Sequence, residues 1–180
     1  MSSLRWEEVA DFFDPDLMGM LPDVVVPNTS VYDWQAVLDL VAERGWPHQY
    51  SEGGRVLATP SAATILTRPL DAECPELRVW PATELLAIFR FHIQEAIDFD
   101  VDLRELQGQQ RLDLFCEFLT AIGRKVNKPV LMDAEGGDGS HPVLGYEVER
   151  NQVVVFAHPV FQPNAPVQNN IEKPDHDNHK

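Results

Sequence analysis

Cysteines, basic residues and long apolar runs are all scarce in this chain, and each shortage excludes a class of protein. Only two of the 180 residues are cysteines, so we expect neither a disulfide-stapled scaffold nor a cysteine-based zinc site. No apolar run approaches the roughly 18 residues of a transmembrane helix. The opening residues, MSSLRWEE, lack the pattern of a signal peptide. We therefore expect a cytoplasmic protein that does not associate with membranes.

The shortage of basic residues leaves a strongly acidic chain. Lys and Arg number 14 against 29 Asp and Glu, which gives a formal net charge of −15. Such a charge repels nucleic-acid phosphates and anionic headgroups over a Debye length of about 8 Å. The composition therefore predicts no nucleic-acid partner, and it leaves a cationic partner, a metal ion or simple solubility as the candidates for what this charge serves.

Length and patterning indicate a single α+β domain. A chain of 180 residues can bury roughly 70% of the surface that its unfolded state exposes. We expect this domain to cover residues 1–158, with residues 1–27 as an N-terminal packing segment that contains the extended stretch LPDVVVP. Residues 159–180 are rich in Pro, Asn and charged side chains, which predicts a mobile C-terminal tail.

Two amphipathic helices are predicted inside this domain. The first begins after Ser30, which can form a capping box with Asp33, and it stops at Gly45. The second covers residues 108–126 and ends at Asn127. Short runs predict strands around these helices: RVLAT, ATILT, LRVW, LLAIFRFH, IDFDVDL, PVLM, PVLGYEVE and VVVFA. The fold class is therefore α+β, a mainly antiparallel sheet with two principal helices packed against it.

One of these strands carries a row of carboxylates. In AIDFDVDLRELQG, Asp98, Asp100 and Asp102 alternate with apolar residues, so in a strand they share one face while the apolar side chains face the core. Like charges spaced about 6.6 to 6.8 Å apart repel each other, and aspartate is a poor strand former. Local propensity therefore does not explain the row.

The preceding run, LLAIFRFH, can pair with this strand as a hairpin across residues 93–95. That register places Arg90 opposite Asp98, where it can offset one negative charge. It leaves the other two aspartates beside Ile88 and Leu86. A surface of this mixed acidic and apolar character suits contact with a cationic protein.

Three interpretations of the row stay open: a solvated face, a recognition surface for a basic protein, or a divalent-metal or acid–base site. The third would use the three aspartates with Glu105 and His92, but side chains on one straight strand diverge instead of converging on an ion. The leading interpretation is an acidic protein-binding module. Its expected partner-binding residues are Ile88, Asp98, Asp100, Asp102 and Glu105.

No other motif supports catalysis. The chain has no G-x-S-x-G elbow, and its cysteines lack a local activating motif. DAEGGDGSHP resembles the start of a calcium loop at Asp133, but its twelfth position is Leu144 instead of glutamate, so we expect a flexible connection. We predict no catalytic residue, metal ligand or cofactor, and on the question of enzyme activity the patterns lean towards no.

Four segments carry a resemblance to known proteins: DWQAVLDLVAERGW, LRVWP, IDFDVDLRELQGQQRLDLF and GRKVNKPVLMDAEG. They resemble segments of small uncharacterised bacterial proteins, and the scheme of an acidic sheet with two packed helices is similar to immunity proteins of bacterial polymorphic toxin systems. The resemblance covers roughly residues 30–157 and transfers no individual residue. It implies a non-enzymatic protein that binds a toxin domain and occludes the toxin's active site.

Overall fold

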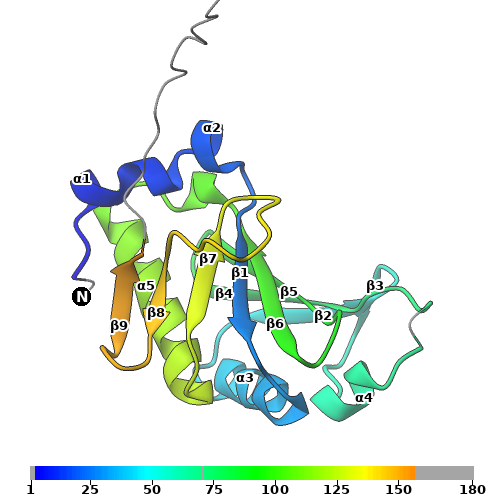
Figure 1. The fold of residues 1–180 in the computed structure, drawn as a ribbon. Helices are drawn as coiled ribbons and strands as arrows, with labels where there is room; N and C mark the ends of the chain where they lie inside the picture. Colours follow the sequence, from blue (N-terminus) through cyan, green and yellow to red (C-terminus); the bar gives the residue numbers. More distant parts are fainter. Residues whose placement is uncertain (1–2, 70, 157–180) are drawn as a thin grey trace, which may run out of the picture.

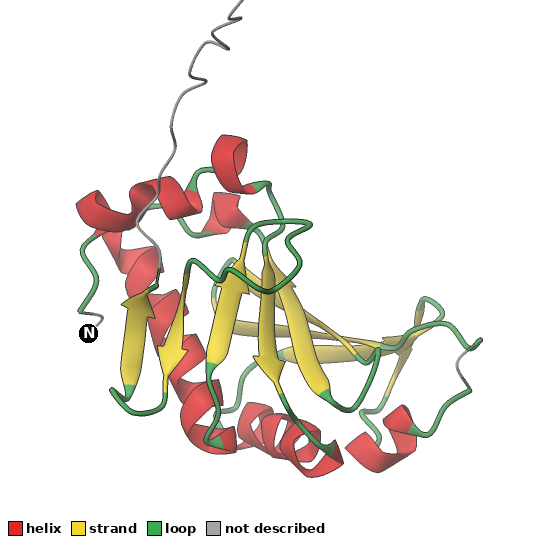
Figure 2. Cartoon of the chain, in the orientation of Figure 1, coloured by secondary structure: helices red, strands yellow, loops and turns green. Residues whose placement is uncertain are grey.

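The computed structural model describes residues 3–69 and 71–156, so the predicted tail lies outside the described residues. The fold is α+β, as predicted, and its centre is a nine-stranded sheet in which all paired neighbours are antiparallel (Figures 1 and 2). The strand order is β3-β2-β4-β5-β6-β1-β7-β8-β9. The strands are β1 (Asp23–Pro27), β2 (His48–Glu52), β3 (Arg55–Leu57), β4 (Glu76–Ala82), β5 (Leu85–Arg90), β6 (Ala96–Val101), β7 (Val130–Asp133), β8 (Leu144–Glu147) and β9 (Gln152–Val155). The helices are α1 (Trp6–Val9), α2 (Pro15–Met18), α3 (Val31–Glu43), α4 (Ala62–Leu66) and α5 (Gln109–Val126), with 3₁₀ turns η1 (Ala10–Phe13) and η2 (Leu103–Glu105).

The core lies between the sheet and the two long helices, α3 and α5, which pack on one side of it (Figure 1). Phe118 of α5 packs edge-on against Phe99 of β6 and Phe89 of β5, with ring centroids 5.5 and 6.3 Å apart. Each large apolar side chain buried in this way contributes about 1.5–3 kcal/mol. The alternate strand residues point to the other side of the sheet, which we call the open face because no helix among residues 3–69 and 71–156 lies across it (Figure 2).

Both principal helices form where the sequence predicts them. Ser30 and Asp33 make the expected capping box at the start of α3. Gly45 follows the helix with a positive φ of 63°, and Asn127 ends α5 in the left-handed conformation with a φ of 53°. None of the described helices combines the length and the apolar character needed to cross a membrane.

Two local predictions are wrong or incomplete. ATILT forms helix α4 instead of a strand, because Ser61 caps its first turn by accepting the Thr64 N–H at 3.3 Å. LPDVVVP supplies β1, which pairs between β6 and β7 near the middle of the sheet. The N-terminal segment does pack on the body as expected, since Phe12 and Phe13 are buried, but it also contributes a central strand.

Candidate functional site

The strand register gathers four aspartates on the open face. Asp23 of β1 lies opposite Asp100 of β6 on one side and Asp133 of β7 on the other. Asp98, two residues before Asp100, lies opposite Val25. We call Asp23, Asp98, Asp100 and Asp133 the acidic face. Neighbouring strands lie only about 4.7–4.9 Å apart, so the carboxylates form a two-dimensional array instead of the single row that the sequence predicts.

Arg90 on β5 contacts this array. The predicted register is confirmed, because Arg90 lies opposite Asp98 and Ile88 lies opposite Asp100. Arg90 offsets part of the Asp98 charge, as expected, but its guanidinium pairs diagonally with Asp100 and lies 3.6 Å from Glu76 of β4. Arg90 has carboxylates on both flanking strands, and it therefore neutralises only part of the acidic face.

Asp98 is an incompletely compensated carboxylate. Burial raises its pKa, and the negative charge of Asp23 adds to that shift. The nearby charges of His92 and Arg90 act in the opposite direction. The net result is that ionised Asp98 is held at a cost to the folded state.

The ionised form of Asp23 is also unfavourable in the folded protein. Burial raises its pKa, and the charges of Asp133 and Glu135 raise it further. A hydrogen bond from the Gly136 backbone lowers it, and the more distant Arg90 does so to a smaller extent. The acidic face therefore carries negative charge that its own surroundings do not fully neutralise.

Asp102 and Glu105 are held by internal contacts instead. The strand prediction through Asp102 is wrong because β6 ends at Val101. The Asp102 carboxylate caps η2 by accepting the Arg104 N–H at 2.9 Å, and it pairs with the Arg104 guanidinium at 2.7 Å. These contacts, of which the Arg104 side-chain hydrogen bond is the strongest, lower the pKa of Asp102.

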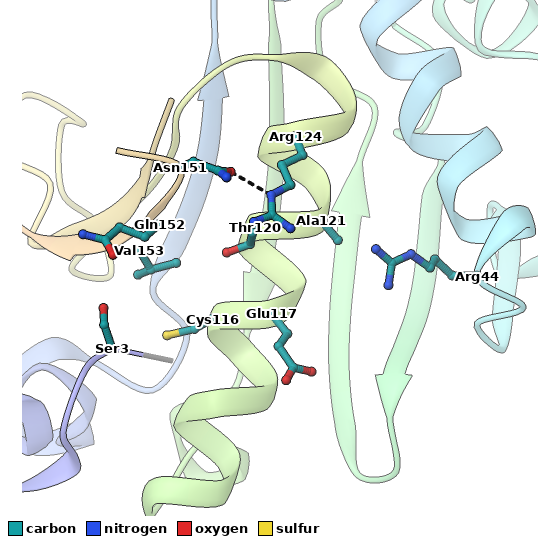
Figure 3. Close-up of a pocket in the computed structure, with 10 residues that line it drawn as sticks. All are labelled: Ser3, Arg44, Cys116, Glu117, Thr120, Ala121, Arg124, Asn151, Gln152 and Val153. Carbon is teal, nitrogen blue, oxygen red and sulfur yellow. Dashed lines mark hydrogen bonds between the residues drawn. The ribbon is translucent and has the colours of Figure 1, made fainter. Parts of the chain in front are cut away.

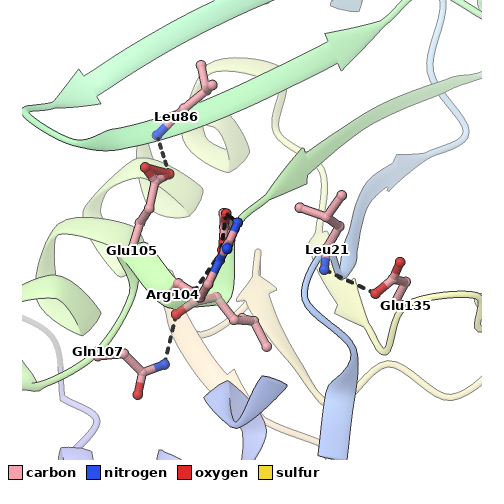
Figure 4. Close-up of polar contacts among 8 residues, drawn as sticks. Leu21, Leu86, Arg104, Glu105, Gln107 and Glu135 are labelled. Atoms are coloured by element: carbon pink, nitrogen blue, oxygen red, sulfur yellow. Dashed lines mark hydrogen bonds and ion pairs between the residues drawn. The ribbon is translucent and has the colours of Figure 1, made fainter. Parts of the chain in front are cut away.

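Glu105 leaves η2 towards β5, where its carboxylate accepts the Leu86 N–H at 3.1 Å (Figure 4). Burial raises the pKa of Glu105, and that hydrogen bond opposes the shift. Of the five residues predicted to bind a partner, Ile88, Asp98 and Asp100 thus lie together on the open face. Asp102 and Glu105 lie at its edge with their carboxylates already engaged.

Asp23 and Asp133 are the members of the acidic face that sequence reasoning missed. Asp133 begins the predicted connection between β7 and β8, and its carboxylate accepts backbone N–H groups of Ala134 and Gly139 at 2.8 and 2.9 Å. Glu135 in the same connection accepts the Leu21 N–H at 3.2 Å (Figure 4). In the sequence, Asp23 and Asp133 look like ordinary carboxylates at the end of a strand or in a loop. Only the pairing of β1 with β7 brings them together.

The geometry gives the metal interpretation no support. In the described ranges, 3–69 and 71–156, no group of three or more His, Cys, Asp or Glu side chains is placed to hold a metal ion. Asp100 is engaged by Arg90, and Asp133 by backbone donors. The acidic face is a negatively charged surface whose carboxylates are partly held by Arg90 and by backbone donors.

A separate cleft of about 410 Å³ lies between α5 and β9 (Figure 3). Arg44 and Arg124 line it, and the Arg124 Nε donates to Asn151 at 2.7 Å. None of the four aspartates of the acidic face lines this cleft, so it is a distinct feature of the helix-covered side.

No family model matches the chain, and neither the curated proteins nor the solved structures contain a significant match. The functional argument therefore depends on the geometry of the open face.

Proposed function

We propose that the protein binds a cationic protein partner through the acidic face, and that it acts as an immunity-type inhibitor which occludes a basic site on that partner. The observation that carries this proposal is the set of four aspartates on three neighbouring strands, with Arg90 compensating only part of their charge. Within the part of the chain that the structure describes, no helix covers these groups (Figure 2).

Electrostatics favours such an association. Like charges directly opposite each other on neighbouring strands destabilise a sheet, so ionised Asp23 beside Asp100 and Asp133 costs free energy in the isolated protein. A lysine or arginine brought by a partner removes that repulsion while it forms new ion pairs. A net charge of −15 also steers a basic partner towards the protein and accelerates its association at low salt.

Apolar side chains among the carboxylates supply contact area. Val25, Ile88 and Leu131 are half-buried residues of the open face, and they lie in the registers that contain the aspartates. Interfaces commonly combine a desolvated apolar centre with charged groups that set orientation. The same charge disfavours nucleic acid as the ligand, whereas it matches a protein whose own groove is basic because it holds nucleic acid.

Affinity capture from the native cell lysate at low salt, with identification of the retained proteins, tests the proposal. The variant Asp23→Asn plus Asp100→Asn removes two negative charges from the acidic face. Asp11→Asn plus Glu149→Gln removes the same charge from exposed positions outside it. We expect the wild type and the control to retain the same basic protein and the acidic-face variant to lose it.

Calorimetry with the purified partner then measures affinity at about 50 mM and about 300 mM NaCl, where electrostatic binding should weaken at the higher salt. Equal binding by the acidic-face variant and the charge-matched control would show that the four aspartates serve only solubility. Retention of no basic protein by the wild type would remove the proposal.

A further inference from the structure

Cys74, His92 and Asp98 meet at one end of the open face, although they come from three different strands or strand extensions. Glu76 of β4 lies opposite Arg90 of β5, and the pairing continues beyond the strands because the Phe91 N–H donates to the Pro75 carbonyl at 3.2 Å. One residue further on, this register places Cys74 beside His92. Asp98 reaches the same place from β6, the next strand in the sheet.

The contacts order these groups as thiol, imidazole and carboxylate. Cys74 Sγ lies 3.4 Å from His92 Nδ1, and His92 Nε2 lies 3.8 Å from Asp98 Oδ2. A nucleophile within reach of a base that is oriented by a third group is the geometry of covalent catalysis on several unrelated folds. The sequence predicts no activating motif near either cysteine, because here the motif is made by strand register instead of local spacing.

A small cavity adjoins the thiol. It has a volume of about 130 Å³, and Cys74 and His92 both line it. Its apolar walls include Ile65, Leu66 and Phe91, and Arg68 and Glu73 add charge. Phe91 is held in place by a stacked contact with Trp34, with ring centroids 4.4 Å apart. A cavity of this size and character accepts a short acyl group beside the sulfur.

We propose that Cys74 is a nucleophile that accepts an acyl group from a small ester, with His92 as its general base and Asp98 as a positioning residue. The Cys74 sulfur attacks the ester carbonyl while His92 takes the thiol proton. The carbon–oxygen bond to the leaving alcohol then breaks, and His92 returns the proton to that oxygen. Water, activated by His92 in the same way, cleaves the thioester and releases the acid and the free thiol.

The surroundings of the thiol explain why a base is needed. Burial raises the pKa of Cys74, and the negative charges of Asp98 and Glu76 add to this effect. A hydrogen bond from the Phe91 backbone and the charge of Arg90 act against it. The thiol is therefore protonated at neutral pH, and its proton has to be removed during attack.

The test uses p-nitrophenyl acetate with the full chain, monitoring p-nitrophenolate release and acetylated peptides by mass spectrometry. We expect a burst of one p-nitrophenolate per chain and acetylation of Cys74. Cys116, buried in α5, serves as an internal control that stays unmodified. Cys74→Ala should lose the burst. His92→Gln should slow it by about 100-fold or more, the range of general-base assistance, and circular dichroism checks that both variants are folded.

The pH dependence separates general-base catalysis from ordinary thiol reactivity. Wild type should react below the pH at which the thiol itself ionises, whereas His92→Gln should react only as that ionisation begins. Asp98→Asn should slow the burst at saturating ester and leave the ester concentration for half-saturation unchanged, because a residue that positions His92 acts on the chemical step and does not touch the ester. Equal rates for wild type and His92→Gln, or equal acetylation of Cys74 and Cys116, would overturn the proposal. Cys74→Ala should bind the cationic partner normally, so this proposal and the proposed function fail independently.

Discussion

Replacing Asp23 with asparagine should make the protein more stable at neutral pH. Asp23 faces carboxylates on both sides, Asp100 and Asp133, and each directly opposed like-charge pair costs about 0.2–1 kcal/mol. The lower half of that range applies to Asp100, because Arg90 already offsets part of its charge. Asparagine keeps an oxygen that can accept the Gly136 hydrogen bond. We therefore expect the free energy of unfolding to rise by about 0.5–1.5 kcal/mol.

Urea unfolding at pH 7, followed by tryptophan fluorescence, measures this change as a shift in midpoint at constant slope. The advantage of Asp23→Asn should shrink at about 1 M NaCl, where the Debye length is about 3 Å. It should also shrink on acidification. Because the folded-state pKa of Asp23 is raised, the stability that this group contributes is present at low pH and is lost as pH rises through that pKa.

Asp102→Asn is the matched control, because it also removes one aspartate charge, at the end of the neighbouring strand β6, but should lower the stability instead of raising it. Asp102 caps η2 and pairs with Arg104, and loss of a charged cap costs about 0.5–2 kcal/mol. Its pKa is lowered, so its contribution is present above the unfolded-state pKa and is lost as pH falls through the folded-state pKa. A destabilised Asp23→Asn protein would refute the reasoning, since it would mean that the Asp23 charge is already compensated.

Three further changes test the packing and electrostatics. Gly123→Ala should destabilise the protein by about 1–3 kcal/mol in thermal unfolding, because an added Cβ would overlap the ring of Tyr146. This cost should exceed the gain from the better helix propensity of alanine. The same change made in a Tyr146→Ala background should be neutral or stabilising. Ser30→Ala should lower the free energy of urea unfolding by about 0.5–2 kcal/mol through loss of the capping box with Asp33, and an unchanged midpoint would contradict that role. Arg90→Gln should lower the free energy of unfolding by roughly 1 kcal/mol at low salt and by less at high salt, because it leaves Glu76 and Asp100 without their shared cation. A loss of stability that does not change with salt would indicate that Arg90 acts through packing.

The helices and the hairpin could be predicted from the sequence because their signals are local. A capping serine, an apolar stripe and a left-handed stop specify α3 and α5 within a few turns of chain. Alternation of apolar and acidic residues places Asp98 and Asp100 on one face, and the short connection sets the register that puts Arg90 opposite Asp98. These features determined the fold class and part of the candidate site.

Side-chain contacts and distant pairings were decided only by the tertiary structure. On β6, Arg90 pairs with Asp100 instead of Asp98, the residue opposite it on that strand, and Asp102 caps η2. Asp23 joins the acidic face because β1 inserts between β6 and β7. Cys74 meets His92 because pairing of β4 with β5 continues past the strand ends. A strand's own pattern specifies which of its faces is buried, but its neighbours are selected by the packing of the whole sheet, so a site assembled across strands has no local signal.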